Sequence, residues 1–127
     1  MITGACGYLG QHFSRAVVAN NGHVILADIN ADTGHEFAQE LNDIAKASDL
    51  TASAEFQSVD ITDIESLKAL INTLTDKYQR IDAIVNNAYP RNKNYGAKFF
   101  DVQYEDFCQK LNSRNSDRYT GKYVFCR

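Results

Sequence analysis

The chain has 127 residues, which suits a single domain with one hydrophobic core. Its net charge of −3 gives no basic footprint for nucleic-acid binding, and no apolar run reaches the roughly 18 residues of a membrane-spanning helix. Its three cysteines are scattered and follow no secretion signal, so we expect reduced thiols in a cytoplasmic protein and neither a disulfide set nor a metal site.

Three glycines, Gly4, Gly7 and Gly10, recur every third residue at the start of the chain. Only Met1 and Ile2 precede the turn, which starts at Thr3-Gly4, whereas a buried strand normally takes about five residues. Either the first strand is very short or residues upstream of Met1 are missing, and we favour the second.

Alternating strand and helix signals follow the turn. A helix is predicted over residues 8–20, and residues 20–22 supply a stop and a turn. Residues 23–27 form a short apolar run typical of a buried parallel strand, which ends at Asp28. The inner face of the first helix is expected to carry Leu9, Phe13, Ala16 and Val17.

Asn30 can cap a second helix that ends near residue 46. Residues 54–59 form the third predicted strand, and Asp60 ends it. Thr62 and Glu65 have the spacing of a capping box, in which each side chain satisfies a backbone donor of the other. The expected inner residues of the second helix are Phe37, Leu41 and Ile44, and those of the third are Ile64, Leu67, Ile71, Leu74 and Tyr78.

Residues 81–85 form a fourth predicted strand, directly before Asn86-Asn87-Ala88-Tyr89. A further helix is expected over residues 104–111, with Phe107 and Leu111 inside. The alternation of strand and helix predicts an α/β fold, a parallel sheet with helices on both faces and right-handed crossovers.

The glycine turn has the chemistry of a pyrophosphate site. A phosphate must approach the backbone closely, and glycine removes the side chain that would block it. The helix that follows presents free amides to the anion. A purely structural turn is the alternative interpretation.

Asp28 is the second candidate, because a carboxylate at the end of the second strand can accept hydrogen bonds from both ribose hydroxyls of an adenosine. It would also repel a 2′-phosphate, and no Arg or Lys lies between Arg15 and Lys46 to bind one. NAD is therefore preferred over NADP. The alternative is an acid that caps a helix or is merely solvated.

Asp60 and the segment 86–89 end the third and fourth predicted strands, at the same carboxyl edge where such folds bind ligands. Asp60 and its neighbouring backbone could meet an adenine amino group, or Asp60 could simply cap beside Thr62. The amides of Asn86 and Asn87 could bridge sheet carbonyls and a ribose, although alone they indicate an ordinary turn.

Taken together, these four elements resemble the short-chain dehydrogenase/reductase family. The resemblance covers about residues 1–112 and implies the N-terminal half of a three-layer Rossmann-type sheet, with about four parallel strands in the order 3-2-1-4. Residues 113–127 form an atypical tail. The resemblance implies NAD contacts at Gly4, Gly7, Tyr8, Leu9, Gly10, Asp28, Ile29, Asp60, Ile61, Asn86, Ala88 and Tyr89.

The glycine spacing here is TGxxGxxG, whereas the compact branch of the family has TGxxxGxG, and Tyr89 replaces the glycine that usually follows Asn-Asn-Ala. The segment 86–95, NNAYPRNKNY, is similar to members linked to bacterial surface-sugar and flagellin-glycan synthesis. The resemblance thus implies an NAD-dependent oxidoreductase that acts on the CH–OH or C=O carbon of a sugar-like small molecule.

The family's catalytic Ser and Tyr-x-x-x-Lys have no convincing counterpart in this chain. Tyr89 and Lys93 have the Tyr-Lys spacing, but Pro90 lies between them and they directly follow the fourth strand. We therefore expect the cofactor-binding half of an enzyme without its catalytic residues. The alternatives are a non-catalytic dinucleotide-binding module and a non-functional fragment. No nucleic-acid, membrane or metal partner is expected, and a homo-oligomer stays open.

Overall fold

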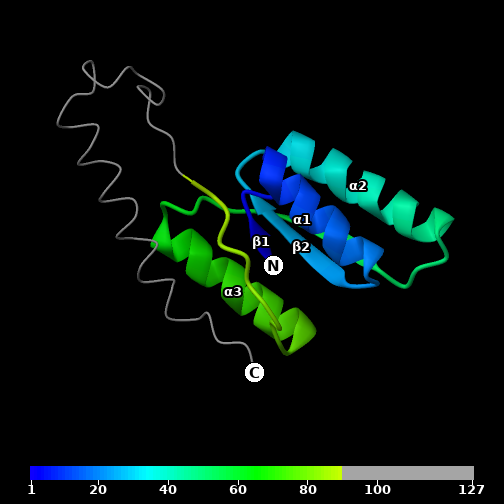
Figure 1. Cartoon of the computed structure of the whole chain (residues 1–127). Helices are drawn as coiled ribbons and strands as arrows, with labels where there is room; N and C mark the ends of the chain where they lie inside the picture. The colour runs from blue at the N-terminus through cyan, green and yellow to red at the C-terminus, as the bar shows by residue number, and fades with distance from the viewer. Residues whose placement is uncertain (90–127) are drawn as a thin grey trace, which may run out of the picture.

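The computed structural model describes residues 1–89, which form a parallel sheet covered by helices (Figure 1). The predicted helix over residues 104–111 and the tail 113–127 lie outside the described residues. Within the described part, no helix is long and apolar enough to cross a membrane. The elements in chain order are β1 (Ile2–Thr3), α1 (Tyr8–Ala19), β2 (His23–Asp28), α2 (Ala31–Ala47), β3 (Ser53–Ser58) and α3 (Ile64–Tyr78).

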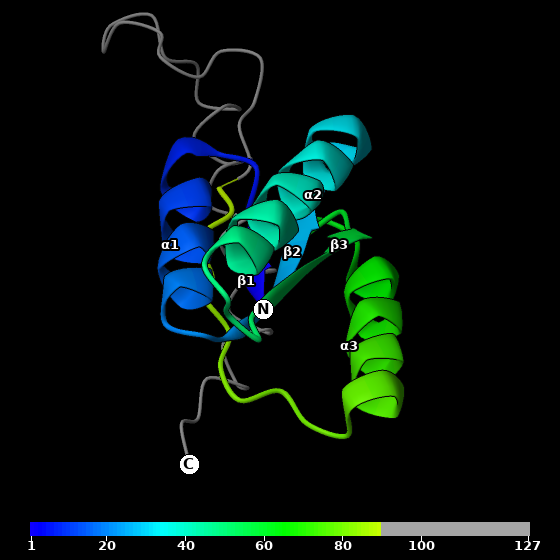
Figure 2. The same ribbon diagram turned by 90° about the vertical axis from the view of Figure 1, so that its right-hand side faces the viewer.

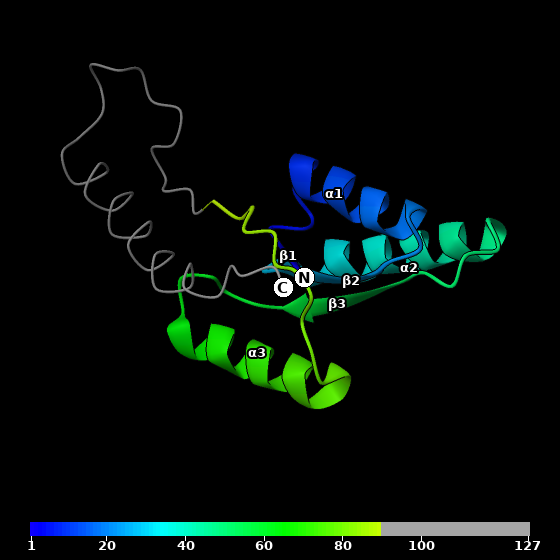
Figure 3. The ribbon, with the colours of Figure 1, turned by 60° about the horizontal axis from the view of Figure 1, so that its bottom comes forward.

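The elements form three layers, with α1 and α2 on one face of the sheet and α3 on the other (Figures 2 and 3). The sheet has the order β1-β2-β3, so that β2 lies in the middle. It pairs with β3 along its whole length, from His23 opposite Ser53 onward, but with β1 only through Leu26 and Ala27. The predicted three-layer α/β architecture is confirmed.

The predicted fourth strand, residues 81–85, is reduced to a single parallel bridge between Val85 and Ile2. The Val85 amide donates to the Met1 carbonyl over 2.9 Å, and the Val85 carbonyl accepts from the Thr3 amide over 3.0 Å. Val85 therefore lies beside β1 on the side away from β2, in agreement with the expected order 3-2-1-4. A longer ladder does not form because β1 offers only two strand residues.

Strand β2 divides the core between the two faces of the sheet. Val24 and Leu26 pack with α2 residues such as Leu41, whereas Ile25 and Ala27 belong to the cluster on the α3 side. Burial on both faces explains why this strand is continuously apolar in sequence.

The inner face of α1 differs from the predicted one. Gly10, Ser14 and Val18 are buried, whereas Leu9 is 56% and Phe13 is 40% exposed. Helix α1 lies so close to the turn after β1 that only small side chains fit between them, and the Ser14 hydroxyl donates to the Gly10 carbonyl at 2.8 Å. The apolar period of Leu9, Phe13 and Ala16 instead marks an exposed flank.

Two further predictions fail at helix ends and faces. Thr62 and Glu65 do not form a capping box, because Asp63 caps α3 by accepting from the Glu65 amide, while the Thr62 hydroxyl donates to Asp60. Two predicted inner residues, Ile44 and Ile64, are exposed. The predicted Asn30 cap of α2 is confirmed, since its side chain accepts from the Thr33 amide.

Asn42 of α2 joins this helix to β3, the last strand of the sheet. Its side-chain amide donates to the Ala54 carbonyl and its side-chain oxygen accepts from the Ala54 amide, both over 2.9 Å. These are the two bonds that a neighbouring strand would offer. Asn42 thereby satisfies strand backbone that helix α2 partly buries.

Asn42→Ala should lower the free energy of unfolding by about 1–3 kcal/mol, because it leaves a partly buried donor and acceptor unpaired. Urea denaturation followed by circular dichroism measures this. The matched control is Gln39→Ala on the same helix, whose amide donates to Asp43 at the surface and whose loss should change stability by less than about 0.5 kcal/mol. Equal effects of the two substitutions would contradict this role.

Candidate functional site

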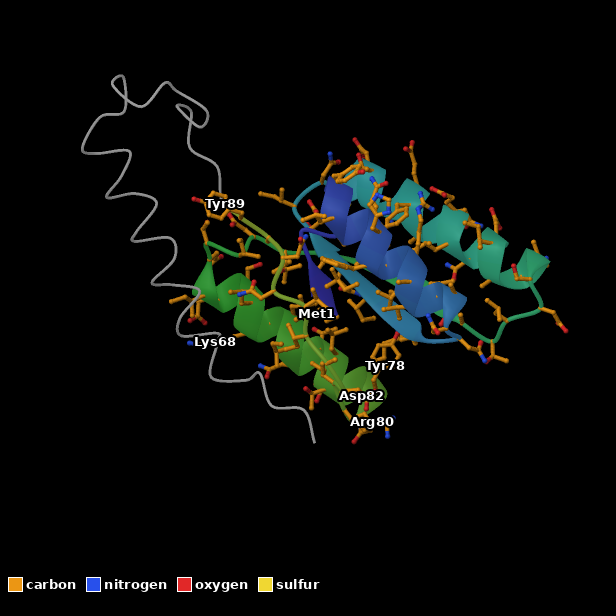
Figure 4. The ribbon with its side chains drawn as sticks, in the orientation of Figure 1. Met1, Lys68, Tyr78, Arg80, Asp82 and Tyr89 are labelled. Atoms are coloured by element: carbon orange, nitrogen blue, oxygen red, sulfur yellow. The ribbon has the colours of Figure 1, made fainter. Side chains whose placement is uncertain are left out.

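The residues singled out in the sequence gather at the carboxyl end of the parallel strands. The glycine turn follows β1, Asp28 ends β2, and residues 86–89 follow the bridge at Val85. Tyr89 lies at this end of the molecule, whereas Tyr78 lies toward the other (Figure 4).

The three glycines have different roles in the turn. Gly4 has φ +62°, and a Cβ there would lie 2.9 Å from the Ala88 Cα, so it needs both the left-handed backbone and the missing side chain. A Cβ on Gly10 would overlap the Gly4 carbonyl and lie 2.7 Å from the Ala5 Cα. Gly7 is the N-cap of α1 and donates to the Gly4 carbonyl over 3.1 Å.

Helix α1 begins with backbone amides that no N-cap side chain satisfies, because the N-cap is a glycine. The amides of Tyr8, Leu9 and Gly10 form its first turn. Free amides and the positive end of the helix dipole at one place favour an anion such as a phosphate. The start of α1 thus leaves backbone amides without an N-cap partner at the place where the sequence predicts a pyrophosphate.

Thr3 and Asn87 lock the turn to the segment after Val85. The Thr3 hydroxyl oxygen accepts from the amides of Asn87 and Ala88, both over 3.1 Å. The Asn87 side-chain amide donates to the carbonyls of Thr3 and Gly4, also over 3.1 Å. Asn87 therefore bridges carbonyls at the end of β1, as predicted for the amides of the Asn86-Asn87 pair. Thr3, only 5% exposed, was not among the predicted site residues.

Asp28 holds the glycine turn from the other side. One carboxylate oxygen accepts from the Cys6 amide over 2.9 Å, and the other accepts from the Asn30 amide over 3.1 Å. A carboxylate has about four lone-pair sites, so each oxygen can accept one more hydrogen bond. The structure thus brings this acid against the turn. Ile29, directly after it, is 70% exposed.

The Cys6 thiol lies beside this carboxylate. Desolvation by burial, together with the Asp28 charge and hydrogen bond, raises the thiol pKa to about 11. The thiol is therefore protonated at neutral pH and is a weak nucleophile.

Asp60 reaches the same sheet edge through β3, since the Val59 amide donates to the Asp28 carbonyl over 3.0 Å. One Asp60 oxygen accepts from both the hydroxyl and the amide of Thr62, and these bonds lower the pKa of the Asp60 carboxyl. The alternative interpretation, an acid that organises the start of α3 beside Thr62, thus accounts for one oxygen. The hydrogen bonds of Asp60 join it to Thr62, Asp63 and Ser66, and within the described residues none joins Asp60 or Ile61 to the glycine turn.

Most of the chain matches a known family. The short chain dehydrogenase family model matches residues 1–115. This chain belongs to the short-chain dehydrogenase family. The members of this family are oxidoreductases that use nicotinamide dinucleotide cofactors and act on small-molecule substrates. Lys93, the one partner of Tyr89 at the family's Tyr-Lys spacing, lies outside the described residues.

Among curated proteins, this short-chain dehydrogenase chain is 35% identical over 112 residues to the post-translational flagellin modification protein A of Campylobacter coli. The match covers 87% of this chain but 42% of that protein. The chain therefore spans less than half the length of this relative.

Solved structures share the fold. A short-chain dehydrogenase/reductase from Mycobacterium ulcerans superposes with a TM-score of 0.79 at 18% identity, over 97% of this chain and 43% of the other. A xylitol dehydrogenase, solved with NAD⁺ bound, superposes with a TM-score of 0.73 at 20% identity, over 97% of this chain and 45% of the other. Because both identities are low, these superpositions establish the fold of this short-chain dehydrogenase chain and nothing more specific.

Asp28→Asn should lower the pKa of the Cys6 thiol, because it removes a negative charge that opposes the thiolate. Iodoacetamide should then alkylate Cys6 several-fold to about tenfold faster at pH 8, since one pKa unit changes the thiolate fraction about tenfold. Peptide mass spectrometry separates Cys6 from the other two cysteines.

Asp32→Asn, which removes an exposed acid from the first turn of α2, is the control and should leave the rate unchanged. In the wild type the rate should rise steadily as the pH approaches 11. An unchanged rate in Asp28→Asn would mean that burial alone sets the thiol pKa.

Proposed function

We propose that this chain is the NAD-binding part of a short-chain dehydrogenase that oxidises or reduces a CH–OH or C=O carbon of a sugar-like metabolite. The contact that carries the proposal is the 2.9 Å hydrogen bond from the Cys6 amide to the Asp28 carboxylate. This bond holds the acid that would accept from the ribose beside the turn whose helix amides would bind the pyrophosphate. These would be the two recognition elements for an adenine dinucleotide.

The residues of this chain would bind and orient the cofactor. The amides of Tyr8, Leu9 and Gly10 would hold the pyrophosphate, and Asp28 would accept from the adenosine ribose. Asp60, Ile29 and Ile61 would flank the adenine, while Asn86, Ala88 and Tyr89 would face the nicotinamide side. The bound nicotinamide would supply the hydride chemistry.

The preference for NAD over NADP rests on charge. The Asp28 carboxylate would repel a 2′-phosphate, and the residues from 16 to 45 contain no Lys or Arg to bind one. Ile29, the exposed residue beside this acid, offers no charge either.

The likeness to a sorbitol dehydrogenase of Cereibacter sphaeroides, 33% identical over 88 residues, supports a sugar-like substrate. We place the partial cofactor domain at residues 1–112 and treat residues 113–127 as an atypical tail. The second candidate function is a non-catalytic dinucleotide-binding module, favoured by the lack of a matching Ser and Tyr-x-x-x-Lys. Purified chain that binds NADH but transfers no hydride would support this second candidate.

Asp28→Ala should weaken NADH binding by about tenfold or more and should weaken NADPH binding less, because only NADH loses ribose hydrogen bonds without relief of phosphate repulsion. Fluorescence titration of the reduced cofactors measures both dissociation constants.

The matched control is Asp32→Ala, an exposed acid on α2 that should leave both constants unchanged. If the wild-type chain does not bind NADH at millimolar concentrations, the proposed function is wrong. Equal losses of affinity for NADH and NADPH would contradict the ribose role of Asp28 and leave the rest of the proposed function standing. Hydride transfer by the purified chain would contradict the expectation that its catalytic residues are absent.

A further inference from the structure

We infer that Gln11 is a positioning residue of the phosphate site, which holds the Cys6 carbonyl away from the bound pyrophosphate. The inference rests on the proposed function, because it concerns how the same glycine turn receives a dinucleotide. Gln11 lies in the first turn of α1, is half-buried, and is not one of the residues predicted to contact the cofactor.

The Gln11 side-chain amide donates to the Cys6 carbonyl over 3.0 Å. The Gln11 backbone amide donates to the Gly7 carbonyl over 2.9 Å. Gln11 therefore donates hydrogen bonds to two successive carbonyls of the turn, those of Cys6 and Gly7.

The carbonyls of two further turn residues, Thr3 and Gly4, are held in a similar way. Those of Thr3 and Gly4 accept from the Asn87 side chain, and that of Gly4 also accepts from the Gly7 amide. Oxygens that face a phosphate would repel it, whereas amides attract it. Tying these carbonyls to amide donors favours the first amides of α1 as the groups that meet an anion.

Cys6 is the residue of the turn whose two backbone groups are both held by side chains. Asp28 accepts from its amide and Gln11 donates to its carbonyl. Its neighbour Gly7 has no side chain to limit rotation of the intervening peptide. Without Gln11, the Cys6 carbonyl would lose its donor, and only the bond from the Gly7 amide to the Gly4 carbonyl would restrain the Cys6–Gly7 peptide. The carbonyl could then turn toward the phosphate more easily.

This arrangement predicts an effect that depends on the phosphates of the ligand. Gln11→Ala should weaken binding of ADP-ribose by about three- to tenfold, the usual effect of one lost hydrogen bond. Adenosine contains the adenine and ribose but no phosphate, so its dissociation constant should change by less than about twofold. Titration of both ligands by protein-observed NMR gives the two constants.

Gln11→Glu is the second, isosteric variant. It cannot donate to the Cys6 carbonyl and adds a negative charge at the start of α1, so its loss of ADP-ribose affinity should exceed that of Gln11→Ala. The excess should shrink as salt is added, because salt screens charge repulsion, whereas the loss in Gln11→Ala should not.

Two controls separate positioning from a general loss of structure. Gln39→Ala, at an exposed position of α2, should leave both ligands unaffected. Asp28→Ala should weaken adenosine as well as ADP-ribose, which is a different pattern from that of Gln11→Ala. Melting temperatures show which variants stay folded.

The wild type should bind ADP-ribose more tightly than adenosine. If it binds ADP-ribose and a folded Gln11 variant binds it equally well, or if adenosine weakens as much as ADP-ribose, the inference is overturned while the proposed function stands. If the wild type binds neither ligand, the proposed function fails and the role of Gln11 fails with it.

Discussion

The close approach of α1 to the turn after β1 is the constraint on which the rest of the structure depends. A Cβ on Gly10 would overlap the Gly4 carbonyl, so the helix can start where it does only because Gly10 has no side chain. The same approach buries Ser14 and Val18 and turns Leu9 and Phe13 outward. It also places the first amides of the helix directly over the end of β1, which is where an anion can reach them.

This approach holds because the turn is braced from three sides. Asp28 of β2 binds the Cys6 amide, Asn87 binds the carbonyls of Thr3 and Gly4, and Gln11 of α1 binds the Cys6 carbonyl. Each brace comes from a different part of the chain, and together they preorganise the loop. Asp28 therefore shapes the glycine turn in addition to the ribose contact proposed for it. A substitution of Asp28 would disturb the turn as well as that proposed contact.

Local signals predicted much of the fold and placed several of the residues that meet in the site. The apolar run of β2, the Asn30 cap and the buried Phe37 and Leu41 of α2 were read correctly, because each depends on neighbouring residues. The capping box failed because Asp63, the residue after Thr62, accepts from the Glu65 amide that the box assigned to the Thr62 hydroxyl. The fourth strand shrank to one bridge because its partner, β1, is only two residues long.

By itself, the sequence determined the family, the order of strands and helices, the positions of Gly4 and Asp28 at strand ends and that of Gly10 at the start of a helix, because spacing along the chain carries this information. Only the tertiary structure decided which face of α1 is buried and which side chains hold the carbonyls of Thr3, Gly4 and Cys6. The partners of Thr3 and Gln11 lie on other elements or across the turn. Hydrogen bonds between segments distant in sequence leave no periodic signal, so their pairing appears only when the sheet brings the strand ends together.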